Sequence, residues 1–284
     1  MTTAAVAVAP ATAPPGSVRT GVGRRWLFLP PALLLGLGLV APLVAVVIAG
    51  AADGPLAMVT GPFSDQTFLR AAVRTLELAA MVTAGSLVIG TVYALALGLA
   101  PRRLSAALFG VLFLTFWISL LVRTFGWILT LQPAGALDAL GLSGGLYQTT
   151  PGLVLAMIHI MLPYVVLPVY AGLRGIDPSH LRAARSLGGG ELLVLRTVVL
   201  PALRSGVAAG GVLVFVMSLG FYVTPAFLGG AGDQVVAIVV GAQLGRLQDL
   251  GGAAAVSVVL LVATLGLYVL ADRVLGIGEQ WEKL

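Results

Sequence analysis

Six long apolar stretches alternate with shorter polar segments along this chain of 284 residues. A helix needs about 20 consecutive apolar residues to cross the hydrocarbon core of a bilayer, and each stretch is long enough. The pattern predicts an all-α membrane protein whose spans lie at residues 26–50, 75–99, 105–130, 150–173, 206–229 and 252–275. Six helices and their loops use nearly all of residues 26–284, so we expect one transmembrane domain there.

Composition agrees with this fold class. The chain is 59% hydrophobic and 10% charged, with a mean hydropathy of +1.05, unlike a soluble domain of this length. Residues 1–25 are rich in alanine, proline and threonine, which predicts a disordered tail. The Arg24-Arg25 pair and Ala49-Gly50-Ala51 imitate a secretory signal, but the apolar run between them exceeds the roughly 7–15 residues of a signal core. We therefore expect a retained first span.

The arginines predict the orientation of the spans, because cytoplasmic loops of membrane proteins are enriched in basic residues. Six spans put both termini on one side, and that side holds twelve basic residues against four on the other. The expectation is therefore that both termini and the loop at 177–206 are cytoplasmic. This topology accounts for the net charge of +5 without a nucleic-acid partner. The residues on the expected cytoplasmic side are Arg19, Arg24, Arg25, Arg102, Arg103, Arg174, Arg182, Arg185, Arg196, Arg204, Arg273 and Lys283. Those on the other side are Arg70, Arg74, Arg123 and Arg246.

The insert at 177–206 is the most polar segment between two predicted spans. Asp177 followed by Pro178 is typical of a helix start, since the carboxylate caps free N–H groups and proline presets φ. Apolar residues then recur at helical spacing, with Arg182 and Arg185 off that face. The resulting short helix is expected to present one apolar face, formed by Leu181, Ala184 and Leu187.

The glycine run at 188–190 is expected to end this helix, because glycine enters left-handed backbone conformations at little steric cost. A second helix is predicted from Glu191 until Pro201 breaks it. Two short helices joined by a turn are also found in DNA-binding modules. The apolar spans on both sides of this insert disfavour that interpretation.

The insert resembles the EAA motif of permease subunits of bacterial ATP-binding cassette (ABC) importers, E-A-A-x-x-x-G followed later by a hydrophobic residue, leucine and proline. Ala183, Ala184, Gly188 and Leu200-Pro201 match, whereas Arg182 stands in the place of the glutamate. In that family the segment is a coupling helix that enters a groove of the cytoplasmic ATPase. The resemblance implies an ATPase-coupling segment that includes Leu181, Arg182, Ala183, Ala184, Arg185, Leu187, Gly188, Glu191 and Pro201.

The runs at 117–127, 159–173 and 219–230 look like those of spermidine/putrescine-type permeases. This resemblance implies a permease of the bacterial cytoplasmic membrane that imports polyamines. It also implies several partners: a pair of ATPase subunits, a second homologous permease chain, membrane lipid, and an extracytoplasmic binding protein. The binding protein would meet the outer loops at 51–70, 131–149 and 230–250.

The sequence lacks the residues that ATP hydrolysis would need. Its only lysine is Lys283, so the phosphate-binding motif G-x-x-x-x-G-K-[ST] is absent. The chain is therefore expected not to be an enzyme and to hold no cofactor, while ATP and magnesium bind the partner ATPase. Cysteine is absent, and neither His159 nor His180 has a carboxylate cluster nearby, which argues against a metal site. His159 is expected to be an interhelical hydrogen-bonding residue.

Prolines and aromatic residues mark a candidate substrate pathway. Pro163, Pro168 and Pro225 remove backbone donors within or near spans, and Gly206-x-x-x-Gly210 predicts a close helix–helix contact. Desolvated ammonium groups gain from aromatic faces and carboxylates. The pathway candidates are Trp117, Trp127, Tyr164, Tyr170, Phe221, Tyr222 and Glu77.

Glu77 also has a simpler interpretation. It follows Arg74 by one helical turn, so an intrahelical ion pair near the outer interface is favoured.

Other functions remain open at this point. The same importer class also carries other small cations, opines and amino-acid-like solutes. A stand-alone secondary transporter would show internal repeats with paired broken helices and charges near the bilayer midplane, and no convincing repeat is present. A membrane protein with a purely structural role is the third alternative.

Overall fold

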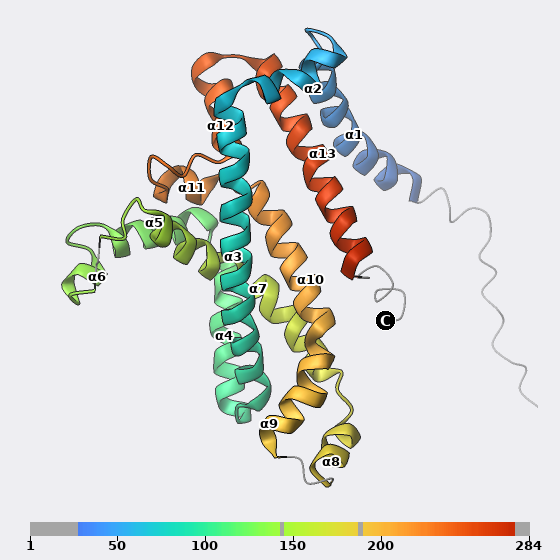
Figure 1. Ribbon diagram of the computed structural model, residues 1–284, viewed down its shortest axis with the longest axis vertical. Helices are drawn as coiled ribbons and strands as arrows, with labels where there is room; N and C mark the ends of the chain where they lie inside the picture. The colour runs from blue at the N-terminus through green and yellow to red at the C-terminus, as the bar shows by residue number, and fades with distance from the viewer. Residues whose placement is uncertain (1–27, 143–144, 187–189, 276–284) are drawn as a thin grey trace, which may run out of the picture. The chain divides into compact units, whose positions relative to one another are not determined.

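The computed structural model describes residues 28–142, 145–186 and 190–275, which form helices and connecting loops without a strand (Figure 1). The expected tail at 1–25, and Leu187 and Gly188 of the insert, lie outside these residues. The chain divides into two units, Met1–Ala45 and Val46–Leu284. Helix α1 spans Leu29–Gly50, and its residues up to Ala45 belong to the first unit. The side chains of this part of α1 are exposed.

The second unit contains four further long helical spans and a bent pair. The unbroken spans are α3 (Gln66–Leu99), α7 (Thr150–Arg174) and α13 (Leu250–Leu275), together with the helix from Glu191 to Leu219, whose last part is α10 (Leu200–Leu219). Together with α1, five helices of the described chain are long and apolar enough to cross a membrane, or six if the bent pair counts as one span. The bent pair is α4 (Arg102–Trp117) and α5 (Leu120–Leu131). The short helices are α2 (Pro55–Ser64), α6 (Ala136–Ala139), α8 (Pro178–Ser186), α9 (Glu191–Val194), α11 (Val223–Leu228) and α12 (Val236–Ala242), with π-helical turns η2 (Leu195–Val199) and η3 (Gln243–Leu247).

Helix α7 is the centre of the second unit. It packs most extensively on α3 and α10, and these two also pack on each other (Figure 1). In the most apolar window of α7, 61% of the residues are buried, compared with 33% in α3 and 17% in α13. Met157, Met161 and Val165 of α7 are completely buried between the neighbouring helices. The other helices expose apolar side chains, as lipid-facing helices do.

Glycines allow α10 to approach α7 closely, as the Gly206-x-x-x-Gly210 spacing predicts. A Cβ atom built on Gly206 would lie 2.4 Å from the carbonyl oxygen of Pro168, and one on Gly210 would lie 3.0 Å from Cα of Val165. Both obstacles are backbone atoms, which cannot rotate away. The α7–α10 contact therefore requires glycine at 206.

The predicted span at 105–130 is not one continuous helix. Helix α4 ends at Trp117, and α5 begins at Leu120 after a bend of 106°. Ile118 and Ser119 adopt extended ψ angles of 127° and 142°, which interrupt the helical hydrogen bonds. The predicted span at 206–229 is likewise interrupted, because α10 ends at Leu219 and α11 begins at Val223. Hydropathy misses such breaks because the residues at them remain apolar.

The expectation that Pro201 ends a helix was wrong. The chain is helical from Glu191 to Leu219, and Pro201 lies inside that run. The π-helical turn η2 precedes it, with the Leu200 N–H donating to the Leu195 carbonyl. Proline lacks an N–H and its ring crowds the carbonyl one turn earlier. The wider π turn relieves this crowding, so the helix continues.

The close contact generates a stability prediction. We expect Gly206→Ala to destabilise the protein by about 1–3 kcal/mol, because overpacking against backbone forces helices apart. Gly110→Ala on α4 is the matched control, because nothing lies within 4 Å of its Cβ position. Alanine favours helix over glycine by about 1 kcal/mol, so the control should be neutral or stabilising. Thermal unfolding of the purified variants measures both, and equal melting temperatures would contradict the contact.

Candidate functional site

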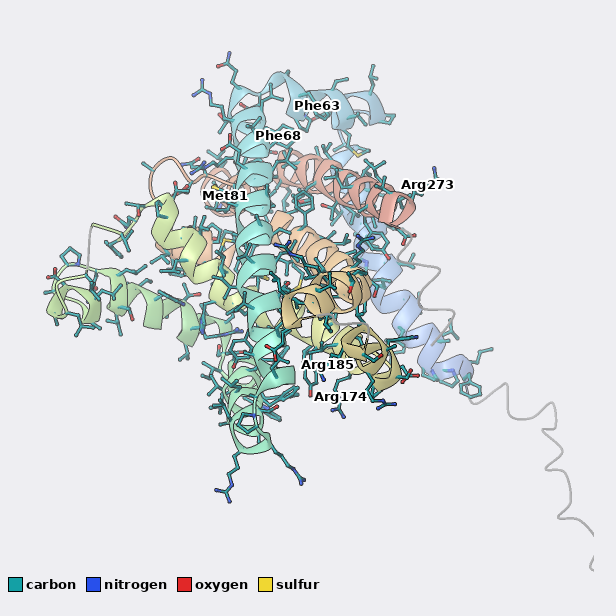
Figure 2. The ribbon with its side chains drawn as sticks, turned by 60° about the horizontal axis from the view of Figure 1, so that its bottom comes forward. Phe63, Phe68, Met81, Arg174, Arg185 and Arg273 are labelled. Atoms are coloured by element: carbon teal, nitrogen blue, oxygen red, sulfur yellow. The ribbon has the colours of Figure 1, made fainter. Side chains whose placement is uncertain are left out.

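Helix α8 projects the polar insert at one end of the second unit. It follows the end of α7 and is followed by α9 and η2, which lead into α10 (Figure 1). Arg174 and Arg185 lie at this end, whereas Phe63 and Phe68 lie at the opposite end (Figure 2). Arg182, Ala183 and Arg185 are exposed, while Leu181 and Ala184 are half-buried. The described part of α8 thus has the one-sided apolar face that the spacing predicts.

Asp177 starts α8 as the sequence predicts. Its Oδ1 accepts a hydrogen bond from the Ser179 backbone N–H at 2.7 Å. This N–H holds the pKa of Asp177 below its ordinary value, because it stabilises the ionised carboxylate. The cap is therefore fully present above the unfolded-state pKa and is lost as the pH falls through the folded-state pKa. At neutral pH the start of α8 is fixed in place.

An open groove of about 680 Å³ lies between α8 and the two spans that flank it. His180 and Ala184 of α8 line one side, Gly172 near the end of α7 lines another, and Thr197 and Ala202 line it from η2 and α10. Helix α8 is joined to both spans but is not packed tightly against either, which suits a segment that moves against a partner.

A buried ion-pair network lies at the end opposite α8. Arg74 of α3 donates to Asp233 at 2.6 Å and to Glu77 at 2.9 Å. Asp233 is 2% exposed, and its Oδ1 also accepts the Thr150 hydroxyl at the start of α7. The network fixes α3, α7 and the loop before α12 together. The ion pair predicted for Glu77 is confirmed, and Glu77 is 54% exposed.

Polar contacts also lie where the broken spans meet α7. Helix α5 packs against α11 and α7 (Figure 1). The hydroxyls of Thr124 and Thr224 are 3.1 Å apart in a buried position. Trp127 donates from Nε1 to Nδ1 of His159 at 3.2 Å, which confirms the hydrogen-bonding role expected for this histidine. These contacts hold the two broken segments against the central helix.

Arg123 of α5 is the least satisfied group in this region. Its Nε is buried and has no hydrogen-bond partner among the described residues. Arg123 lies one helical turn before Trp127 on α5. Because the indole N–H of Trp127 only donates, Nδ1 of His159 must accept and the neutral ring carries its proton on Nε2. Among the described residues, no carboxylate forms an ion pair with Arg123.

The structure brings together only some of the aromatic pathway candidates. Tyr164 and Tyr170 pack edge-on against phenylalanines of α4, with ring centroids 5.7 and 4.9 Å apart. Trp117 is 86% exposed at the end of α4. Phe221 and Tyr222 lie in the turn between α10 and α11, half-buried and 46% exposed respectively. The candidates thus line α7 and mark the breaks in the two interrupted spans.

Sequence reasoning missed two residues of these clusters. Asp233 follows a glycine-rich stretch, and nothing local indicates that it pairs with Arg74, 159 residues earlier. Arg123 entered the sequence argument only as a charge on the outer side. Its apolar neighbours on both sides were the available signal, because an arginine within an apolar run has to find a partner.

Interrupted apolar spans around a buried central helix, with an exposed helical insert at one end, are the features expected of a membrane-transport permease. Residues 86–280 match the family described as binding-protein-dependent transport system inner membrane component. The match covers more than half of the chain, which therefore belongs to this family. It is a multi-pass inner-membrane component of an ABC importer, and the family supports partnership with a separate ATPase and a binding protein.

Similar proteins agree with this assignment. The spermidine/putrescine transport system permease protein PotB of Escherichia coli K12 is 28% identical over 213 residues, covering 72% of this chain and 77% of PotB. The inner membrane ABC transporter permease protein YdcU of the same strain is 30% identical over 223 residues, covering 72% and 71%. The resemblance to spermidine/putrescine-type permeases is thus confirmed.

A solved structure supports the fold. One chain in the crystal structure of a bacterial alginate ABC transporter, in complex with a periplasmic protein bound to alginate pentasaccharide, superposes with a TM-score of 0.74. The two chains are 18% identical, and the match covers 89% of this chain and 94% of the other. At this identity the similarity shows a shared fold and carries no information about the solute.

The buried ion pair generates a second prediction. We expect Asp233→Asn to destabilise the protein by about 1–3 kcal/mol, because it leaves Arg74 without its buried counter-charge. Glu77→Gln removes the exposed partner of the same arginine, and an exposed ion pair contributes at most about 1 kcal/mol. Thermal unfolding and hydrogen exchange of the loop at 229–235 measure the difference. An equal effect of the two substitutions would show that burial of Asp233 does not matter.

Proposed function

We propose that this chain is a permease subunit that imports small polyamines, with α8 as the segment that receives the ATPase. The proposal places both termini and the insert at 177–206 in the cytoplasm, because twelve of the sixteen basic residues fall on that side of the spans. It also includes a second, homologous permease chain. One insert serves one ATPase subunit, so a pair of ATPase subunits requires two inserts.

The exposed face of α8 is the observation that carries the coupling part of this proposal. An exposed helix with an arginine-bearing rim, fixed between the ends of α7 and α10, is suited to docking in a groove of a soluble partner. Movement of the ATPases would reach α10 through α9 and η2, because the helix is continuous from Glu191 to Leu219. Helix α10 contacts α7 at Gly206, so this movement would be transmitted to the centre of the bundle.

The polyamine assignment is supported by PotB and by aromatic side chains along α7. Ammonium groups without their water shell gain from aromatic faces. Tyr164 and Trp127 offer such faces at the junction of α5 and α7. The pathway candidates include one carboxylate, Glu77, and it is engaged by Arg74. High-affinity capture of the cation would therefore rest with the extracytoplasmic binding protein, as the family description implies.

Arg123 favours a second candidate function, import of an amino-acid-like solute. Its buried Nε has no hydrogen-bond partner among the described residues, and no described carboxylate forms an ion pair with it. A carboxylate of a zwitterionic solute would satisfy this guanidinium through charge-assisted hydrogen bonds. A polyamine has no such group, so the response of transport to changes at Arg123 distinguishes the two candidates.

Uptake of labelled solutes by cells that lack this chain tests the proposal. Polyamine import predicts that ATP-dependent uptake of putrescine or spermidine is lost and that plasmid-borne wild-type chain restores it. The Arg123→Gln variant should then restore polyamine uptake to near the wild-type level, since removing a cation does not harm binding of another cation.

Normal polyamine uptake in the deletion strain would contradict the polyamine assignment. If uptake of a labelled amino-acid-like solute is abolished instead, the second candidate is supported. In that case Arg123→Gln should lower uptake roughly 10- to 100-fold, because a charge-assisted hydrogen bond is lost. Arg123→Lys, which keeps the charge, is the matched control and should retain more activity.

A further inference from the structure

An apolar groove of about 590 Å³ lies on the outside of the central helices, away from α5 and α11. Side chains of α3, α10 and α13 line it, and all except two of them are apolar or glycine. The exceptions are Thr83 of α3 and Arg204 of α10. The groove is therefore suited to an apolar molecule that also carries a group complementary to the positive charge of Arg204.

The length of the groove corresponds to one leaflet of a bilayer. Its α10 wall runs from Arg204 to Val216, which spans about 18 Å at the rise of an α-helix. Half of the hydrocarbon core of a bilayer is about 15 Å thick. An acyl chain of a phospholipid therefore fits along the groove within a single leaflet.

Arg204 lies at the end of the groove where α10 approaches the polar insert. It is exposed, and among the described residues it has no carboxylate within ion-pairing distance. The residue lies thirteen positions after Glu191, where the helix that leads from the insert begins, and a long arginine side chain can extend along the helix toward the headgroups. Its positive charge is complementary to a phosphate or another anionic headgroup.

We propose that this groove binds an anionic phospholipid, whose acyl chain lies between α10 and α13 and whose headgroup phosphate binds Arg204. The assignment of the lipid to the cytoplasmic leaflet rests on the proposed topology, whereas the binding itself does not. Because α10 continues from the coupling segment, the lipid lies against the helix through which ATPase movement would pass. Occupancy of the groove should therefore alter uptake as well as lipid retention.

Arg273 provides a matched control for the charge. It lies in the last turn of α13, at the C-terminal end of that helix (Figure 2). It follows the groove residue Ala271 by two positions, which places it about 200° around the helix and away from the groove wall. Arg273→Gln and Arg204→Gln thus remove the same charge, but only Arg204→Gln changes the groove.

The test is lipid retention by the full importer complex in nanodiscs that contain equal amounts of phosphatidylglycerol and phosphatidylcholine. After transfer to detergent, native mass spectrometry measures the ratio of the two lipids bound to the permease. We expect the wild type to be enriched in phosphatidylglycerol, and Arg204→Gln to lower this enrichment about fivefold, the usual contribution of one basic residue near an anionic lipid. Arg273→Gln should leave the ratio unchanged.

A groove-filling variant tests the acyl-chain part of the proposal. Val212→Trp places an indole in the groove and should reduce retention of both lipids, whereas Leu265→Trp on the exposed, opposite face of α13 should not. Equal retention of the two lipids by the wild type, or an unchanged ratio in Arg204→Gln, would overturn the proposal. So would loss of the second permease chain from Val212→Trp with unchanged lipid retention, since the groove would then be a subunit interface.

Discussion

The close contact of α10 with α7 is the constraint on which the rest of the structure depends. Gly206 meets the Pro168 carbonyl without room for a side chain, and Gly210 approaches Val165. Because apolar burial drives helix association weakly in lipid, contact of this kind and interhelical polar contacts hold a membrane bundle together. The contact also links the helix that continues from the insert to the helix that bears Tyr164 and His159. In the proposed function, coupling and solute passage would therefore share one interface.

Two further features build on that interface. At one end, the Arg74–Asp233 pair and the Thr150 hydroxyl join α3 and α7 to the loop before α12. At the other end, an open groove of about 680 Å³ separates α8 from the flanking spans, and the chain continues from the insert into one helix that reaches Leu219. The end with the ion pair is thus closely connected, whereas α8 stands apart from the bundle.

The sequence predicted the parts of this architecture that depend on local patterns. Apolar length identified the spans, Asp177-Pro178 identified the start of α8, and the Gly206–Gly210 spacing identified a close contact. It failed at Ile118-Ser119 and at the turn after Leu219, because most of the residues around these breaks are apolar and the breaks depend on packing. The Arg123 and Asp233 environments were not predictable, since their neighbours come from distant segments. The coupling and pathway roles of all the candidate residues stay predictions.

Cross-linking from α8 to the ATPase tests the central claim that this insert receives the driving force. The chain contains no cysteine, so a single introduced cysteine is the only thiol in this chain that can form a cross-link. Arg182→Cys, exposed on α8 and outside the groove behind it, should cross-link to the ATPase in the assembled importer, with a yield that changes when ATP is added. Thr60→Cys, exposed on α2, should give no such product. Cross-linking from Thr60→Cys and none from Arg182→Cys would contradict both the topology and the coupling role of the insert.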